Sequence, residues 1–346
     1  MTQAALSDDD CRKAIDALEA CEGNKTEAAK LLGLNRKTFC SRLVNALARK
    51  DSLKPITLPE FPEDDLPVRD LIEINKKRFV KREAHATARK WFPIKVNVAG
   101  PIGVSFFGDP HVDNNGCNWP LLDHHCDLHR KNDALFAVNI GDTTDNWMGR
   151  LLRLAAKSDT SQSSARKLAK WLLLDSGVTW LANLFGNHDD WNDGAAILEA
   201  MAGHVVPMHD WQAQFRLVFP KGRECRVWAA HNFAGHSMWN TLHGPQKAAH
   251  TKDAADIYAA GHTHNWAVHQ EESASKGFVY WLIRSRGYKF IDDHAEKLGH
   301  AGQQEGAAIT AIIDPEAKSM AGFVQCFADM DEAVDYLRFR RKRAKA

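Results

Sequence analysis

The stretch LFGNHDD, residues 184–190, places an amide, an imidazole and two carboxylates directly after an apolar run. That run, 178–185, has the length and the glycine boundary that predict a buried strand. Gly186 permits a tight turn out of the strand, and Asn187 and His188 follow at once. Polar side chains of this kind at the end of a core strand predict a functional site.

Four other apolar runs also end in carboxylate or imidazole side chains. They span 102–107, 134–140, 226–230 and 257–260, and the motifs that follow them are GDPH, GDTTD, H and GHTH. Because ligands in open α/β folds gather beyond the carboxyl ends of strands, we expect the five ends to converge. A helical segment is expected at 165–174, and later strands at 278–283, 307–313 and 321–327. The pattern predicts an α/β or α+β layered domain.

The five motifs supply imidazole, carboxylate and amide groups but no thiolate. These candidate ligands are Asp109, His111, Asp142, Asn187, His231, His262 and His264. The donor types suit Zn, Fe or Mn and argue against a structural zinc site. Seven protein groups are too many for one ion with an open position, but they suit two ions. Two metals about 3.5–4 Å apart are a common device for in-line displacement at phosphorus.

The order D-x-H, G-D-x-x-D, G-N-H-D, H, G-H-x-H is similar to that of the calcineurin-like metallophosphoesterase superfamily, over about residues 100–330. The resemblance implies a metallophosphoesterase β-sandwich flanked by helices. It implies that one metal is held by Asp109, His111 and His264, the other by Asn187, His231 and His262, with Asp142 bridging both. The implied cofactors are two divalent metal ions, with Mn²⁺ favoured over Fe or Zn.

The same resemblance implies catalytic roles for two residues that are not ligands. His188 corresponds to the histidine that stabilises the developing charge or protonates the leaving oxygen. Asp145 corresponds to the aspartate that orients this histidine in the Ser/Thr-phosphatase branch. However, Asn146-Trp147 stands where that branch has Arg-Gly, and GNHD replaces its GNHE. Both departures argue against protein-phosphatase activity. Further candidates for phosphate or base contacts are Arg284, Arg286 and Tyr288.

Residues 8–49 differ from the rest of the chain because they contain no histidine: all 17 histidines lie at or beyond His85. Apolar spacing predicts a first helix with a buried stripe at Cys11, Ile15 and Leu18. Asn24 and Asn35 are predicted to cap the second and third helices, and Gly33 to end the second. In the third helix, Phe39 and Leu43 are expected to face inward.

The stretch GNKTEAAKLLGLNRKTF resembles the helix-turn-helix of the Fis-type DNA-binding family, over about residues 10–48. In such modules the second helix of the motif enters the major groove. The resemblance therefore implies a DNA-contact surface made of Asn35, Arg36, Lys37, Thr38, Ser41 and Arg42. The alternative is a helical module for interaction or dimerisation.

The expected domains are a helix-turn-helix domain (1–50), a Pro-rich linker with a basic helix (51–95), a metallophosphoesterase domain (96–330) and a basic C-terminal tail (331–346). Net charge is +1, so any nucleic-acid signal must be local. The basic cluster in 76–82 and the tail either contact nucleic acid or are solvated. No apolar run approaches the roughly 20 residues of a membrane helix. The N-terminus lacks signal-peptide features, and seven scattered cysteines predict reduced thiols in a cytoplasmic setting.

The leading hypothesis is a dinuclear-metal-dependent phosphodiesterase or nuclease that acts on nucleic acid, with DNA as the partner of its helix-turn-helix. A homodimer is one expected form, because single helix-turn-helix units act in pairs on half-sites. An alternative is a phosphatase or phosphodiesterase for small molecules or proteins, with the helix-turn-helix for targeting. A third is a non-catalytic DNA-binding regulator, which ranks last because no ligand is missing.

Overall fold

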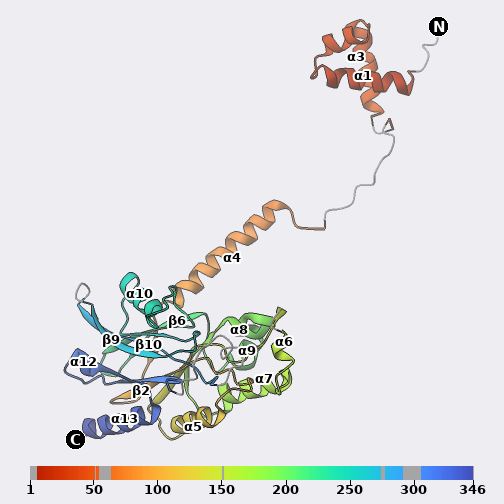
Figure 1. The fold of residues 1–346 in the computed structure, drawn as a ribbon. Coiled ribbons are helices and arrows are strands. Elements are labelled where there is room, and N and C mark those ends of the chain that lie inside the picture. Colours follow the sequence, from red (N-terminus) through yellow and green to blue (C-terminus); the bar gives the residue numbers. More distant parts are fainter. Residues whose placement is uncertain are drawn as a thin grey trace. The chain divides into compact units, whose positions relative to one another are not determined.

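The computed structural model of the chain describes residues 6–50, 52–53, 64–149, 152–273, 277–290 and 305–345. The chain divides into two compact units, residues 1–77 and 78–346 (Figure 1). Helix α4, Val68–Ala88, spans the boundary and has no buried residue, and it is the basic helix expected within 51–95. Most of the predicted linker, 51 and 54–63, lies outside the described residues. In the described ranges no helix has the length and apolar character needed to cross a bilayer.

The first unit contains the helices α1 (Asp8–Ala20), α2 (Lys25–Leu31) and α3 (Arg36–Ala48). Both predicted caps are confirmed, because the side-chain oxygen of Asn24 accepts from backbone N–H groups of α2 and that of Asn35 accepts from Thr38. Gly33 has a φ of 65°, the left-handed conformation that ends a helix and favours glycine. These local signals fix where the helices begin and end.

The core of this unit is made largely of small side chains: Cys11, Ala14, Ala17, Ala28, Ala29, Phe39, Leu43, Ala46 and Leu53. The predicted inward side of α3 is confirmed. The predicted stripe of α1 holds only at Cys11, since Ile15 and Leu18 are half-buried at the edge of the core. Alanines occupy the helix contacts because small side chains let helices approach closely, which the apolar spacing alone did not reveal.

The second unit contains two six-stranded sheets, as the predicted layered fold requires. One sheet has the order β12-β11-β2-β3-β4-β5, and the other β1-β6-β7-β8-β10-β9. The strands of the first are β2 (Ile102–Phe107), β3 (Leu135–Asn139), β4 (Trp180–Phe185), β5 (Met208–Asp210), β11 (Ala308–Ile313) and β12 (Val324–Phe327). Those of the second are β1 (Phe92–Lys95), β6 (Gln212–Val218), β7 (Glu224–Ala230), β8 (Ile257–Ala260), β9 (Ala267–Ser273) and β10 (Phe278–Arg284).

Parallel pairing explains why the five motif-bearing strands end together. In the first sheet β2, β3 and β4 are neighbours and run parallel, with Phe107 opposite Asn139 and Asn139 opposite Asn183. In the second sheet β7 runs parallel to β8. The carboxyl ends of neighbouring parallel strands lie at one edge of a sheet, and there the loops that carry the predicted ligands begin.

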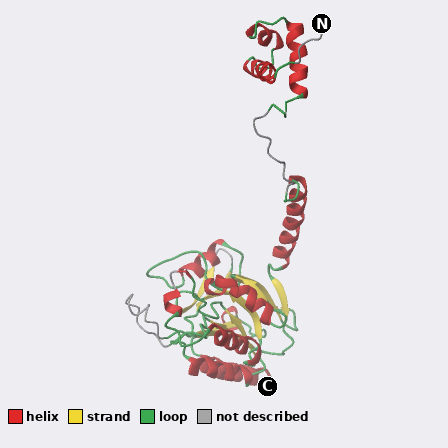
Figure 2. Ribbon diagram, turned by 90° about the vertical axis from the view of Figure 1, so that its right-hand side faces the viewer, coloured by secondary structure: helices red, strands yellow, loops and turns green. Residues whose placement is uncertain are grey.

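Helices lie over the strands of this unit (Figure 2). They are α5 (Trp119–Arg130), α6 (Leu152–Ala155), α7 (Gln162–Lys170), α8 (Asn187–Asp190), α9 (Gly194–Ala202), α10 (His243–Thr251), α12 (Met320–Phe323) and α13 (Met330–Lys345). A π-helical turn, Trp171–Asp175, continues α7. Strand β7 shows the alternation of a sheet with two covered faces: Val227 belongs to the main core, and Trp228 belongs to a second core that includes residues of α10.

Residues 331–345, predicted as a basic tail, belong instead to helix α13. Its Ala333, Val334 and Leu337 are buried, and the helix packs on β11 and β2. Two of its basic side chains interact with other parts of the second unit: Arg340 forms an ion pair with Asp314, and Arg341 donates a hydrogen bond to the backbone carbonyl of Pro101. The apolar residues at i, i+1 and i+4 bury one side of the helix and leave charge on the other.

Residues 92–95, at the end of the region predicted as linker and basic helix, form a strand of the second sheet. Strand β1 pairs in parallel with β6, with Phe92 opposite Phe215. Its burial alternates between half-buried Phe92 and Ile94 and exposed Pro93 and Lys95. A proline within a short run concealed this strand in the sequence, but proline is tolerated because β1 is an edge strand.

A buried histidine of the core predicts how stability changes with pH. Burial lowers the pKa of His129 to about 3, whereas an unfolded histidine titrates near 6.5. Between these values the unfolded chain binds the additional proton, so the free energy of unfolding decreases as the pH falls, by at most about 1.4 kcal/mol per pH unit. Urea unfolding with EDTA from pH 7 to 4 should show this decrease, with a shallower slope for His129→Gln. Equal slopes for the two proteins would contradict the lowered pKa of His129.

Candidate metal centre

The loops after β2, β3, β4, β7 and β8 bring all seven predicted ligands into one region. Asp109, His111, Asp142 and His231 are each at most 2% exposed. Four of the seven have a positive φ: His111 at 42°, Asp142 at 51°, His262 at 71° and His264 at 51°. Left-handed backbone in non-glycine residues is uncommon and concentrates at functional sites, where the surrounding structure enforces it.

Two glycines of the motifs are required by close approach between the loops. A Cβ atom on Gly186 would lie 2.1 Å from Oδ1 of Asp142 and 2.7 Å from a ring carbon of His231. Gly141 has a φ of 110°, and a Cβ there would lie 2.7 Å from the backbone nitrogen of Gly186. The loops after β3 and β4 therefore pack backbone to backbone, which brings Asp142 next to His231.

Three potential ligand atoms surround the ring nitrogen Nε2 of His231. Nδ1 of His262 lies 3.0 Å from it, Oδ1 of Asn187 3.2 Å and Oδ2 of Asp142 3.4 Å. Nδ1 of His231 lies 3.0 Å from the backbone carbonyl of Ile140. Because a carbonyl only accepts hydrogen bonds, Nδ1 carries the proton and Nε2 is left as a ligand atom. This set coincides with the predicted second metal site and its bridging aspartate.

Charge in this group is arranged to hold a cation. Burial alone would lower the pKa of His231, but contacts with Asp142 and Asp109 raise it to about 9. Burial opposes the charge of Asp142, and the contact with His231 outweighs it and keeps the pKa of that carboxyl below its usual range. A proton on His231 thus takes the place that a divalent ion would take between the same imidazole and carboxylates.

The remaining predicted ligands, Asp109, His111 and His264, lie near Asp142 and one another. Nε2 of His111 is 4.0 Å from Oδ2 of Asp142, and Nε2 of His264 is 3.9 Å from Oδ2 of Asp109. Asp109 is fully buried, its Oδ2 accepts from the backbone N–H of His262, and its Oδ1 has no hydrogen-bond partner among the described residues. Burial, with the charge of Asp142, raises the pKa of Asp109 to about 6. A buried carboxylate of this kind fits a metal ligand.

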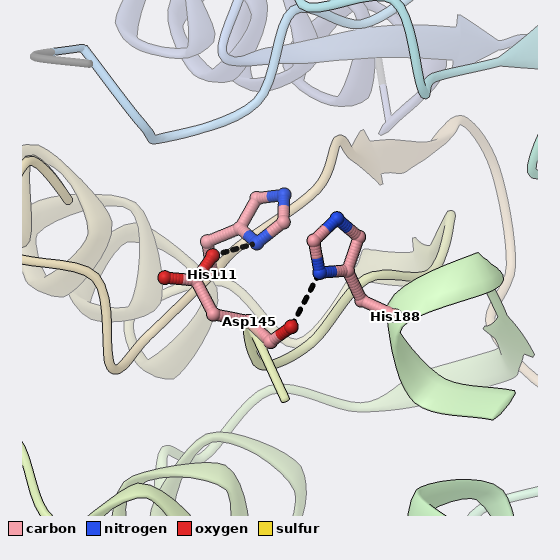
Figure 3. A group of neighbouring side chains, drawn as sticks. All are labelled: His111, Asp145 and His188. Carbon is pink, nitrogen blue, oxygen red and sulfur yellow. Dashed lines mark hydrogen bonds and ion pairs between the residues drawn. The ribbon is translucent and has the colours of Figure 1, made fainter. Parts of the chain in front are cut away.

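His111 also contacts a carboxylate on its other ring nitrogen. Its Nδ1 lies 2.8 Å from Oδ1 of Asp145, while Nδ1 of His188 contacts the backbone carbonyl of Asp145 (Figure 3). This differs from the expected pairing, in which the Asp145 carboxylate orients His188. The carboxylate is instead fixed by Asn114, which donates to its Oδ2 at 2.6 Å. A carboxylate on Nδ1 sets the tautomer in which Nε2 of His111 is free to bind a metal.

His111, Asp145 and His188 are also close enough to hold an ion between them, as are Asp142, His231 and His262. The first of these groups contains the two predicted catalytic residues and no second carboxylate. The metal content of a His188 variant distinguishes a ligand role of this group from a catalytic one.

Aromatic rings enclose His188. The ring of Trp191 lies 4.3 Å from it, that of Trp147 4.9 Å and that of His111 4.9 Å. Asn146 donates to the backbone carbonyl of His188 at 3.1 Å. The Asn-Trp pair that replaces Arg-Gly in this chain therefore packs and bonds against His188. Burial, together with the charge of His111, lowers the pKa of His188 to about 4.

Asp189, which the motifs left without a role, joins two of the loops. It is fully buried, and its carboxylate accepts from the backbone N–H of Thr143 at 3.0 Å and of Gly186 at 2.9 Å. Burial and the neighbouring charge of Asp142 raise its pKa to about 7. Asp189 holds the loop after β3 against the start of α8, whereas Asp190 is exposed.

The predicted phosphate or base contacts after β10 are not available to a substrate. Arg284 is 3% exposed and donates to the carbonyls of Thr241 and Gly261, so it ties the loops of His231 and His262 together. Tyr288 is fully buried, and its hydroxyl contacts His125. Arg286 is 5% exposed and stacks on Phe290. In a sequence, arginines and a tyrosine in a polar motif look like substrate contacts. Here Arg284 donates to buried carbonyls, Arg286 stacks on a ring and the Tyr288 hydroxyl contacts His125.

Sequence reasoning missed two residues beside the centre. Lys289 is 7% exposed, and its Nζ lies 5.2 Å from the ring centre of Trp147. Trp211, in the turn between β5 and β6, lies 5.1 Å from the ring of His231. Neither belongs to a strand-end motif, so only the folded arrangement reveals them. Trp147 was visible as a departure from the Arg-Gly pattern.

The residues predicted to contact DNA lie at the start of α3. Asn35 caps the helix through its side chain, while Arg36, Lys37, Thr38 and Ser41 are exposed. Arg42 is half-buried and lies 3.3 Å from Asp10 of α1. Five of the six residues, Asn35 included, are therefore exposed on this surface.

Residues 14–43 match the family described as bacterial regulatory protein, Fis family, so the chain contains a Fis-type helix-turn-helix, as predicted. Among solved structures, the Haemophilus influenzae NAD nucleotidase (NadN) is similar at 8% identity with a TM-score of 0.36. The similarity covers 66% of this chain but 49% of that one, so the chain spans about half of that length. No curated protein matches the sequence. The activity of this chain is therefore inferred from its own site.

Proposed function

We propose that this protein is a dinuclear-metal-dependent phosphodiesterase or nuclease that acts on nucleic acid recruited by its helix-turn-helix. One observation carries the proposal: a single carboxylate oxygen, Oδ2 of Asp142, lies 3.4 Å from Nε2 of His231 and 4.0 Å from Nε2 of His111, one residue from each predicted ligand group. A carboxylate shared by two such groups suits a pair of ions, and paired ions are used chiefly for phosphoester hydrolysis. Mn²⁺ is the favoured ion.

Two ions would polarise the phosphoryl group and supply the nucleophile at neutral pH. The protein's own side chains then orient the reaction. Asp109 and Asp142 provide the negative charge that holds the ions, and the neutral amide of Asn187 adds a ligand without adding charge. His188 keeps a proton on Nδ1 because this atom contacts the carbonyl of Asp145, so Nε2 is the nitrogen left to meet a substrate. A phosphate's negative charge near Nε2 favours a protonated imidazole, which can deliver a proton to the leaving oxygen.

The Fis-type helix-turn-helix supports a nucleic-acid substrate over a small molecule. Exposed Arg36 and Lys37 open α3, where base and phosphate contacts form in such modules. The helix α4 adds exposed basic residues at Lys77, Arg78 and Lys81. A phosphatase or phosphodiesterase for small molecules or proteins is the second candidate, and the metal centre alone does not separate the two.

Activity against a substrate panel tests the proposal. The full-length protein with Mn²⁺ is assayed against single-stranded DNA, double-stranded DNA, bis-p-nitrophenyl phosphate and p-nitrophenyl phosphate. We expect hydrolysis of the diesters and of DNA. Hydrolysis of the monoester alone would overturn the nuclease assignment, and turnover unaffected by EDTA would overturn the metal centre.

Removing two charges from α3 tests the role of the helix-turn-helix. Arg36→Ala with Lys37→Ala is expected to weaken DNA binding and to reduce the slope of log Kd against log salt concentration by about 1.8, because two phosphate contacts are lost. Turnover of bis-p-nitrophenyl phosphate should not change. Lys13→Ala with Lys50→Ala, two exposed lysines of the same unit outside α3, is the matched control. If both double variants have the same salt slope as the unmodified protein, α3 does not read DNA.

A further inference from the structure

A cavity of about 490 Å³ adjoins the metal centre and is lined by residues of β6, β7 and α10. Trp211 forms part of its wall, and the same ring lies 5.1 Å from that of His231 and 6.5 Å from that of His262. Asn232, which follows His231 in the chain, also lines the cavity, and its carbonyl accepts from Nε1 of Trp211 at 2.9 Å. The cavity and the ligand group around His231 therefore share a wall.

The conformation of Trp211 sets it apart from a structural core tryptophan. It is 36% exposed and has a φ of 56°. A bulky residue rarely adopts this backbone conformation, and such residues concentrate at ligand sites. Four of the predicted metal ligands have the same left-handed backbone. The chain thus holds a large aromatic ring partly open to solvent, next to the site of the reaction.

The lining of the cavity combines aromatic rings with polar groups able to bind a ligand. Trp228 and Phe233 extend the aromatic wall. Nε1 of Trp228 donates to the side-chain oxygen of Gln212 at 3.0 Å, which leaves the amide NH₂ of Gln212 as a donor. Gln214 and Lys247 also line the cavity, and their side chains make no hydrogen bond or ion pair within the described ranges.

This composition fits a nucleotide. A nucleobase stacks on an exposed indole and pairs its polar edge with side-chain amides. The ammonium group of Lys247 suits a flanking phosphate. The one carboxylate of the lining, Asp253, is already engaged by Lys90 at 3.0 Å and by Trp91 at 3.0 Å, so it does not oppose an anionic ligand. The volume falls in the range of sites for small molecules and cofactors.

We propose that this cavity is a nucleobase subsite, in which Trp211 stacks on the base of the nucleotide next to the scissile phosphodiester. The inference rests on the proposed function, because it names the substrate of the same metal centre. A base that stacks on a side chain cannot remain stacked in a duplex. The favoured substrate is therefore single-stranded or locally unpaired nucleic acid.

Two diesters with the same leaving group test the subsite. They are thymidine 5′-(p-nitrophenyl phosphate), which carries a base, and methyl p-nitrophenyl phosphate, which does not. With the full chain and Mn²⁺, Trp211→Ala is expected to lower kcat/KM for the thymidine ester by about 10- to 100-fold, the usual effect of losing one stacked base. The methyl ester should change by less than about twofold if the ring contributes stacking alone.

Two further variants separate stacking from other effects. Trp211→Phe keeps an aromatic ring and should retain most of the turnover of the thymidine ester. Phe339→Ala removes an aromatic side chain of α13 that is 51% exposed, and it should change neither rate. An equal loss on both esters with Trp211→Ala would mean that Trp211 only supports the metal centre, and no loss on either would mean that it does not meet the base. Either result would overturn the proposed nucleobase subsite.

Binding separates a failure of the subsite from a failure of the proposed function. If the unmodified protein hydrolyses neither ester, the phosphodiesterase assignment is wrong. Titration calorimetry with thymidine 5′-monophosphate then still tests the cavity: we expect binding that weakens at least about 10-fold in Trp211→Ala. The same affinity in both proteins, or no binding in either, would overturn the inference.

Discussion

Replacing Asp142 with asparagine is expected to lower kcat/KM for bis-p-nitrophenyl phosphate by about a thousandfold. Oδ2 of Asp142 lies 3.4 Å from Nε2 of His231 and 4.0 Å from Nε2 of His111, so one carboxylate serves both ligand groups. Its Oδ1 also accepts from the backbone N–H of His188 at 2.9 Å. Asparagine retains a side-chain oxygen for such contacts but removes the charge that two cations share.

The loss should appear in metal content as well as in rate. Elemental analysis after equilibration with Mn²⁺ is expected to show fewer than two ions per chain for Asp142→Asn. Asp123→Asn removes a carboxylate of α5 that is largely exposed, and it should retain both the activity and the metal content. Full activity in Asp142→Asn would contradict the bridging role.

Replacing His188 with alanine is expected to lower kcat by about 10²- to 10⁴-fold, the range for loss of a positioned general acid or base, while two ions remain bound. His188 is held by the carbonyl of Asp145 and by the rings of Trp147 and Trp191. These contacts orient the imidazole without using Nε2. The loss should be smaller for a p-nitrophenyl ester than for an alkyl ester, because a good leaving group needs less help from a proton.

The same variant decides between two roles for the group in Figure 3. His111, Asp145 and His188 lie close enough together to hold a metal. If His188→Ala binds only one ion, His188 is a ligand and the general-acid assignment is wrong. If the loss is the same for both leaving groups, His188 does not act on the leaving oxygen. Trp191→Phe, which keeps an aromatic ring beside His188, should change the rate far less.

The candidate metal ligands could be predicted from the sequence because each lies in a short, recognisable segment. An apolar strand followed by an imidazole, carboxylate or amide side chain, in four of five cases after a glycine, is a local pattern, and the five patterns predicted the strand ends that the fold brings together. The caps at Asn24 and Asn35 were predictable for the same reason, because each acts within one turn of its helix.

Features that depend on long-range packing were not predictable. The side chain of Asp145 contacts His111, 34 positions earlier in the chain, and spacing does not reveal which of two histidines a carboxylate will meet. Strand β1 is short and contains Pro93, and its pairing with β6 is fixed only in the folded sheet. The basic residues of α13 were predicted as a tail, because the sequence does not show that Arg340 and Arg341 meet Asp314 and Pro101.

Trp211 illustrates the same limit at the site. It precedes an ordinary strand and follows no motif, and its place beside His231 arises because the chain turns between the two sheets there. The substrate therefore has to be inferred from the cavity that Trp211 lines, whereas the candidate metal ligands are visible in the sequence.

Titration of the EDTA-treated protein with Mn²⁺, followed by turnover of bis-p-nitrophenyl phosphate, tests the central claim most directly. Two ligand groups that share Asp142 predict that activity rises with added Mn²⁺ and reaches its maximum at two ions per chain. A maximum at one ion per chain, or no turnover of the diester with Mn²⁺, Fe²⁺ or Zn²⁺, would contradict the dinuclear phosphodiesterase.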